Sequence, residues 1–210
     1  VLRNAYGLLA LSMIPTAIGA LFGVQMDWTF AINSPILTVL GYLALTYGLI
    51  FAIEKNATSG IGVLLMFALT EVMGSALGPI LKVALSLSNG GQLVAYAAGA
   101  TGLVFFGLAA YVTATGKDFS RWGQFLMVGL IVVLVATIAN LFFKMPVFSL
   151  VVSSAIVLLM SMFILFDVSR IVRGGETNYI RAALSLYLDV YNLFVALLRI
   201  LMILMGNSRD

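Results

Sequence analysis

The sequence predicts an all-α integral membrane protein: a bundle of seven transmembrane helices, with the seventh at the centre. First, 62% of the 210 residues are hydrophobic and 9% are charged, whereas a soluble domain carries about a quarter charged residues. Second, seven windows are apolar over about 20 residues, the length that crosses a bilayer. Third, the last window has a polar stripe. A soluble helical protein would need polar faces that these windows lack.

The seven predicted spans form a single domain, residues 1–210, joined by short polar connections. They cover residues 6–24, 34–53, 60–81, 92–115, 124–143, 148–171 and 179–205. In order, the connections are QMDWTFAINSP, EKNATS, SLSNGG, GKDFSRWG, KMPV and RGGETN, all rich in turn-forming residues. We find no internal repeat, which argues against an inverted-repeat transporter.

The first span is long enough to cross the membrane and lacks the small-residue cleavage pattern of a signal peptide. Because the chain begins at Val1 rather than at methionine, we expect an N-terminal tail to precede it. The third span contains Gly74-x-x-x-Gly78 followed by Pro79. The glycine pair predicts a close helix contact, and the proline predicts a kink.

The basic residues predict the orientation of the spans. Cytoplasmic loops of membrane proteins carry an excess of Lys and Arg. Lys82 and Lys144 fall on one side of the predicted membrane. The opposite side holds Arg3, Lys55, Lys117, Arg121, Arg170, Arg173 and Arg181. We therefore expect a multi-pass protein with a cytoplasmic N-terminus, and we attribute the net charge of +3 to membrane topology rather than to a nucleic-acid partner.

Cysteine and histidine are both absent. Disulfides, thiolate or imidazole metal sites and Cys/His or Ser/His/Asp catalysis are therefore excluded. Any metal ion bound here would be hard and oxygen-liganded, such as Ca²⁺. We expect no resident cofactor and no enzymatic activity, with Ca²⁺ as a transported or weakly bound ion.

The seventh span carries a stripe of small and polar residues at helical spacing, with large apolar residues opposite. The stripe consists of Ala182, Ser185, Asp189, Asn192, Ala196 and Arg199. Such a stripe is expected to face other helices or a wet cavity rather than lipid. This expectation places helix seven inside the bundle.

Asp167 ends the sixth span, and Asp189 lies deeper, by about 7 Å if both helices run straight at about 1.5 Å per residue. Helix tilt could bring the two carboxylates side by side. In contact, they would titrate as one unit that shares a proton, and when deprotonated they would attract a divalent cation. We therefore take Asp167 and Asp189 as the ion- and proton-binding residues, supported by a polar seam of Ser185, Asn192, Glu71 and Arg170.

Structural alternatives stay open for these residues. Asp167 could simply pair with Arg170 at the membrane interface. Asp189 could accept a hydrogen bond from a neighbouring hydroxyl, although a carboxylate at mid-helix costs about 2.5–3.5 kcal/mol on insertion scales. Glu71, a third acid within a span, is equally open to a structural or a functional role.

At the C-terminal end, FILFDVSRIV (163–172) and NYIRAALSLYLDVYNLF (178–194) resemble the signature of the Bax inhibitor-1 (TMBIM) family, and ALGPILK (76–82) and ANLFF (139–143) resemble its weaker marks. GGETNYIRA (174–182) is similar to the bacterial YccA-like branch. The resemblance implies a bacterial inner (plasma) membrane protein with helix seven at the centre of the bundle. It also implies an aspartate pair, matching Asp167 and Asp189, that gates a pH-dependent Ca²⁺ leak.

One departure from the leak-forming members concerns the latch. Those members have an arginine at the end of helix two that can latch onto the helix-seven aspartate. Here the segment is EKNATS (54–59), where Lys55 is only the nearest cation. The chain thus combines YccA-like loops with the aspartates of the leak branch.

Two functions follow from the sequence. The first is a pH-sensitive calcium leak, with membrane lipid, Ca²⁺ and protons as partners. The alternative is modulation of the membrane protease FtsH without transport. An intramembrane aspartyl protease is disfavoured, because Leu186-Tyr187-Leu188 replaces the Gly-x-Gly expected before Asp189. A retinal protein is disfavoured because helix seven contains no lysine.

Overall fold

The computed structural model describes residues 1–143 and 145–206, and these residues are almost entirely helical, without a β-strand. Lys144, used above to predict orientation, lies outside the described residues. The helices are α1 (Leu2–Gln25), α2 (Thr29–Asn33), α3 (Pro35–Lys55), α4 (Gly60–Ala76), α5 (Gly78–Ser86), α6 (Gly90–Thr115), the 3₁₀ turn η1 (Ser120–Trp122), α7 (Gly123–Phe143), α8 (Pro146–Val172) and α9 (Tyr179–Met205).

Among the described residues, seven helical segments are long and apolar enough to cross a membrane. The predicted fold class is therefore confirmed, and most span ends agree within a few residues. Helices are the expected solution, because in lipid every backbone N–H and C=O must find its partner within the protein.

The third span differs in detail from its prediction. It extends to Ser86 and breaks at Leu77, which divides it into α4 and α5. Pro79 lacks an N–H and its ring would clash with the carbonyl of Ser75, one turn earlier. The predicted proline kink is thus confirmed as a break between two helices.

By their contacts, the described residues divide into two compact units. Unit 1 comprises residues 1–83 and 178–184, and unit 2 comprises residues 84–177 together with residues from 185 onward. Helix α9 contributes its first turns to unit 1 and the remainder to unit 2. The predictions of a single domain and of a central seventh helix stay predictions.

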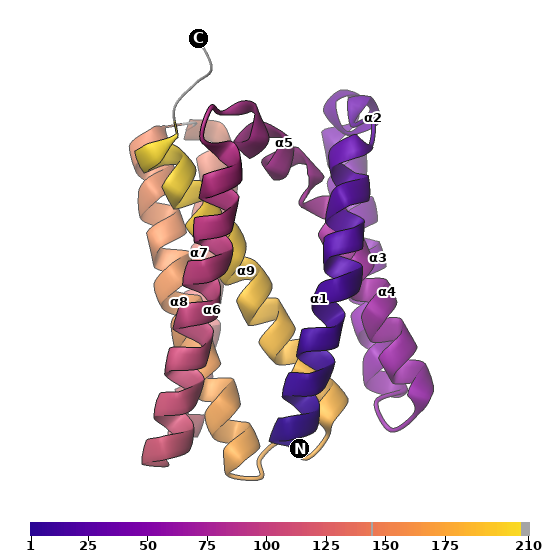
Figure 1. Ribbon diagram of the computed structural model, residues 1–210, viewed down its shortest axis with the longest axis vertical. Coiled ribbons are helices and arrows are strands. Elements are labelled where there is room, and N and C mark those ends of the chain that lie inside the picture. Colours follow the sequence, from indigo (N-terminus) through magenta and orange to yellow (C-terminus); the bar gives the residue numbers. More distant parts are fainter. Residues whose placement is uncertain (144, 207–210) are drawn as a thin grey trace. The chain divides into compact units, whose positions relative to one another are not determined.

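In unit 1, α1 lies against α4, and α4 also packs against α3 (Figure 1). The backbones of α1 and α4 approach each other closely because glycines occupy the contact positions. A Cβ on Gly19 or Gly23 would overlap backbone atoms of α4, and a Cβ on Gly74 would overlap the Thr16 carbonyl oxygen. A Cβ on Gly78 would likewise meet the Gly23 carbonyl oxygen. The predicted close contact at Gly74-x-x-x-Gly78 is confirmed.

In unit 2, α8 packs against both α6 and α7 (Figure 1). Gly116 ends α6 in the left-handed conformation, with φ of 62°, which favours glycine because a Cβ would be strained there. Gly174 follows the end of α8 with φ of 77°. Gly116 thus begins the α6–α7 loop, and Gly174 begins the α8–α9 loop. Both loops are described with the candidate site below.

Candidate functional site

The side chains of Asp167 on α8 and Asp189 on α9 form a hydrogen bond with each other within unit 2. Both residues are buried, with 8% and 6% of their surface exposed. A hydrogen bond between two carboxyl groups needs a proton on one of them, because ionised carboxylates only accept. A contact of this kind can hold one proton between the two carboxyl groups.

The carboxylate of Asp189 is buried within this pair. Its Oδ2 atom is buried and accepts no hydrogen bond from an N–H or hydroxyl donor among the described residues. Loss of the proton would leave two adjacent, poorly solvated negative charges, which repel each other and attract a cation.

The donor set does not suit a resident calcium ion. Calcium takes about six to eight oxygen ligands, whereas the described residues contain no cluster of three or more acidic or other typical metal-binding side chains.

Arg170 is the cation that the structure places beside the pair. Its Nη1 lies 3.7 Å from Oδ1 of Asp167, and its Nη2 lies 4.0 Å from Oε2 of Glu176. The backbone N–H groups of Gly175 and Glu176 both donate to the Arg170 carbonyl, which folds the α8–α9 loop back over this residue. Arg170 therefore links one member of the aspartate pair to the loop that follows α8.

The α6–α7 loop is fastened to the same end of α8. The buried Ser169 hydroxyl oxygen accepts the Phe119 N–H at 3.0 Å. Arg173 donates to the Gly116 carbonyl at 2.8 Å, and its Nε lies 3.6 Å from Oδ1 of Asp118. Residues on both sides of Arg170 thus hold the neighbouring loop in place.

Asp118 forms hydrogen bonds within the same loop. The Ser120 hydroxyl and backbone N–H both donate to its carboxylate, and they hold the pKa of Asp118 below its ordinary value. A lowered pKa means that the folded loop favours the ionised form. This stabilisation is present at neutral pH and disappears as the pH falls through the lowered pKa.

Ser169→Ala is expected to loosen the α6–α7 loop, because the Phe119 N–H loses its acceptor. A hydrogen bond contributes about 0.5–1.5 kcal/mol, so hydrogen exchange at the Phe119 amide should accelerate by up to about tenfold. Ser161→Ala on the same helix is the control, because the Ser161 hydroxyl donates only to its own helix at Val157. Equal Phe119 exchange in the two variants would refute this assignment.

In unit 1, the start of α9 is fixed by a different set of contacts. Asn178 caps the helix by accepting the N–H of Ile180 at 2.8 Å, and its amide donates to the Ala57 carbonyl at 2.7 Å. Arg181 pairs with Glu54 at 2.8 Å. Lys55, the nearest cation by sequence, lies over the ring of Phe51.

The supporting residues predicted for the site differ in their exposure and contacts. Ser185 is half-buried one turn before Asp189, whereas Asn192 is exposed and donates to the Leu188 carbonyl of its own helix. Glu71 is exposed and belongs to unit 1. The opposite, apolar face of α9 is also buried, as at Leu184 and Leu193, so burial is not restricted to the polar stripe.

Sequence reasoning missed Ser169, Arg173 and Glu176 as neighbours of the site. Ser169 and Arg173 are four residues apart and therefore share a helix face. This spacing could have been used to predict that they act together. Their partners, however, are mostly backbone atoms of a loop some fifty residues earlier. Backbone N–H and C=O groups are present at nearly every residue, so a sequence pattern cannot identify which of them will be the partner.

Comparison with known proteins matches residues 1–208 to the sequence family described as inhibitor of apoptosis-promoting Bax1. A membrane protein of Vibrio cholerae is 45% identical over 209 residues, covering 99% of this chain and 91% of that protein. YccA of Escherichia coli K12, named a modulator of FtsH protease, is 45% identical over 203 residues, covering 96% of this chain and 89% of YccA. A Pseudomonas aeruginosa protein is 42% identical over 208 residues, covering 99% and 91% of the two chains.

Proposed function

The chain belongs to the Bax inhibitor-1 family, and from this premise we propose that it modulates an FtsH-type protease in the bacterial inner membrane. The observation that supports this proposal is its 45% identity to YccA over 96% of the chain. A relative from Escherichia coli O6:H1, also 45% identical over 203 residues, carries the name inner membrane protein YccA. The N-terminus is cytoplasmic in this proposal, as the loop charges favour.

Modulation needs no catalysis by the chain itself. A seven-helix protein that binds the protease within the membrane competes with membrane substrates for access. Adding the purified chain to liposomes that contain FtsH should therefore slow the degradation of a membrane substrate, increasingly so at higher ratios of chain to protease. An unrelated seven-helix protein at the same density is the control, and equal degradation rates with both proteins would refute the proposal.

We further propose that the aspartate pair makes the protein a proton-dependent cation leak. The observation that favours this second function is the buried hydrogen bond between Asp167 and Asp189. With the proton in place, the pair joins α8 to α9. Once the proton leaves, like charges repel and Ca²⁺ gains an attractive, weakly liganded site, from which it can also depart.

Arg170 takes the place of the missing latch arginine in this proposal. It lies on the same helix as Asp167, three residues later, and is partly exposed, so its ion pair is screened by solvent and weak. A weak pair leaves Asp167 free to respond to protonation. Glu176 competes for the same guanidinium, which further limits how firmly Arg170 holds Asp167.

A further inference from the structure

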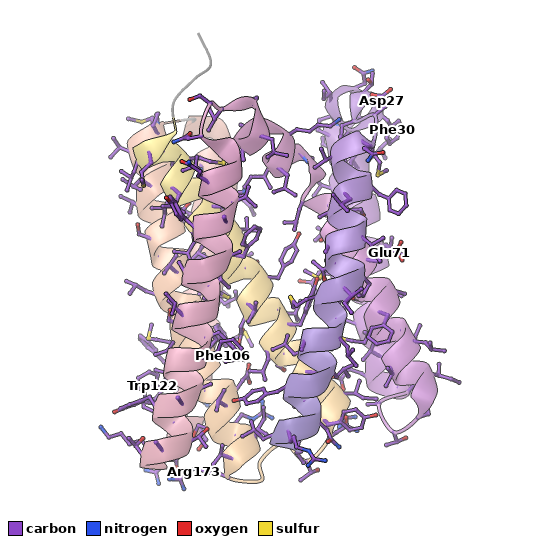
Figure 2. The ribbon with its side chains drawn as sticks, in the orientation of Figure 1. Asp27, Phe30, Glu71, Phe106, Trp122 and Arg173 are labelled. Atoms are coloured by element: carbon purple, nitrogen blue, oxygen red, sulfur yellow. The ribbon has the colours of Figure 1, made fainter. Side chains whose placement is uncertain are left out.

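Glu71 is an exposed carboxylate in the middle of a membrane-spanning segment. It is residue 12 of the 27 in Gly60–Ser86, which places it about 17 Å along the helix at 1.5 Å per residue. This is about halfway across a hydrocarbon core of about 30 Å. Figure 2 labels its side chain on α4, in the half of that helix nearer to α5. Acidic residues at this depth are rare and are usually paired or functional.

The chain itself offers Glu71 no partner of opposite charge. The Glu71 side chain makes no hydrogen bond or ion pair with any described residue. Every lysine and arginine in the described spans lies within two helical turns of a span end, including Lys82 and Arg199. A cation at the depth of Glu71 must therefore come from another molecule.

An apolar groove lies beside Glu71 on the same unit. It has a volume of about 300 Å³ and is lined by Leu11, Ile14, Pro15, Ile18 and Phe67. Phe67 lies one turn before Glu71 on α4 and therefore on the same helix face. A Cβ added to Gly19, the residue after Ile18, would overlap the Glu71 backbone carbonyl oxygen. We name the groove together with the neighbouring Glu71 carboxylate the Glu71 surface.

We propose that the Glu71 surface docks a transmembrane helix of another membrane protein that carries a lysine or arginine near its middle. The groove accepts apolar side chains of that helix, and the carboxylate accepts the hydrogen bonds of its cation. Charge complementarity argues for this occupant, since the described residues of a second copy offer no cation at mid-depth. Lipid head groups stay at the membrane surface and do not reach this depth.

This proposal goes beyond protease modulation and cation leak, because it assigns a binding surface in unit 1 that neither function requires. It is tested with the full chain in phosphatidylcholine vesicles and two labelled synthetic Leu/Ala helices. One helix has lysine at its midpoint, and the other has leucine there. Energy transfer should show that the lysine helix binds about three- to thirtyfold more tightly, the range expected for polar contacts between membrane helices.

Two variants separate the parts of the Glu71 surface. Glu71→Leu should remove the preference for the lysine helix, while the Tm of the protein stays unchanged or rises, because the carboxylate has no partner in the fold. Ile14→Trp should fill the groove and weaken the binding of both helices. Leu134→Trp, at an exposed apolar position on α7, is the control and should change neither.

Equal binding of the two helices to the wild-type protein would overturn the proposal and leave acyl chains as the occupants of the groove. A preference for lysine that persists in Glu71→Leu would overturn it as well. A lower Tm in Glu71→Leu would show that the carboxylate serves the fold, which the proposal excludes.

Discussion

Asp189→Asn is expected to make calcium flux through the protein independent of pH. The asparagine amide can donate a hydrogen bond to Asp167 without a proton, so it imitates the protonated pair permanently. It also removes one of the two negative charges that would attract Ca²⁺. Flux in proteoliposomes should therefore remain, at every pH, at the level that the wild-type protein shows when the pair is protonated.

Asp167→Asn should have the same effect, because either residue can supply the amide donor. Ser161→Ala on α8 is the control, since the Ser161 hydroxyl donates only to the Val157 carbonyl of its own helix and its loss should leave the pH dependence intact. Wild-type pH dependence in Asp189→Asn would contradict the leak proposal. It would leave the protease proposal untouched, because that proposal does not involve the pair.

Gly74→Ala is expected to give the largest loss of stability in unit 1. A Cβ at this position overlaps the backbone of Thr16, and backbone atoms cannot rotate aside as a side chain can. The α1–α4 contact must open locally, at a cost of about 1–3 kcal/mol for overpacking. The unfolding midpoint in detergent, measured with a chemical denaturant, should fall accordingly.

Gly48→Ala on α3 is the control for helix propensity, because nothing lies within 4 Å of a Cβ at Gly48. Alanine is the better helix former by about 0.5–1 kcal/mol, so this variant should be as stable as the wild type or more so. Equal midpoints for the two variants would show that α1 and α4 are not packed as closely as described.

The helices of this protein were predictable because lipid leaves the backbone few alternatives. Long apolar windows therefore gave span ends within a few residues, and Pro79 marked where the third span breaks. The spacing of Gly74 and Gly78 also predicted a close helix contact, because only small residues allow two helix backbones to approach so closely. The partner helix, however, could not be read from that spacing.

The candidate site was predictable only in part. Asp167 and Asp189 stood out because a carboxylate in an apolar helix demands an explanation. Their contact depends on helix tilt, which no residue pattern states. An ion pair between Asp167 and Arg170, one turn later, was considered from the sequence and is present in the structure. Helical spacing was enough to predict the Asp167–Arg170 ion pair, but it did not predict that Glu176 also pairs with Arg170.

Infrared spectroscopy of the carboxyl groups tests the central claim, one shared proton, most directly. The measurement counts protonated carboxyls in the Glu71→Leu background, so that Glu71 does not contribute. We predict that one proton per molecule titrates from the buried pair and that Asp167→Asn and Asp189→Asn each abolish that signal. Two independently titrating protons, or a signal that survives in either variant, would contradict the account.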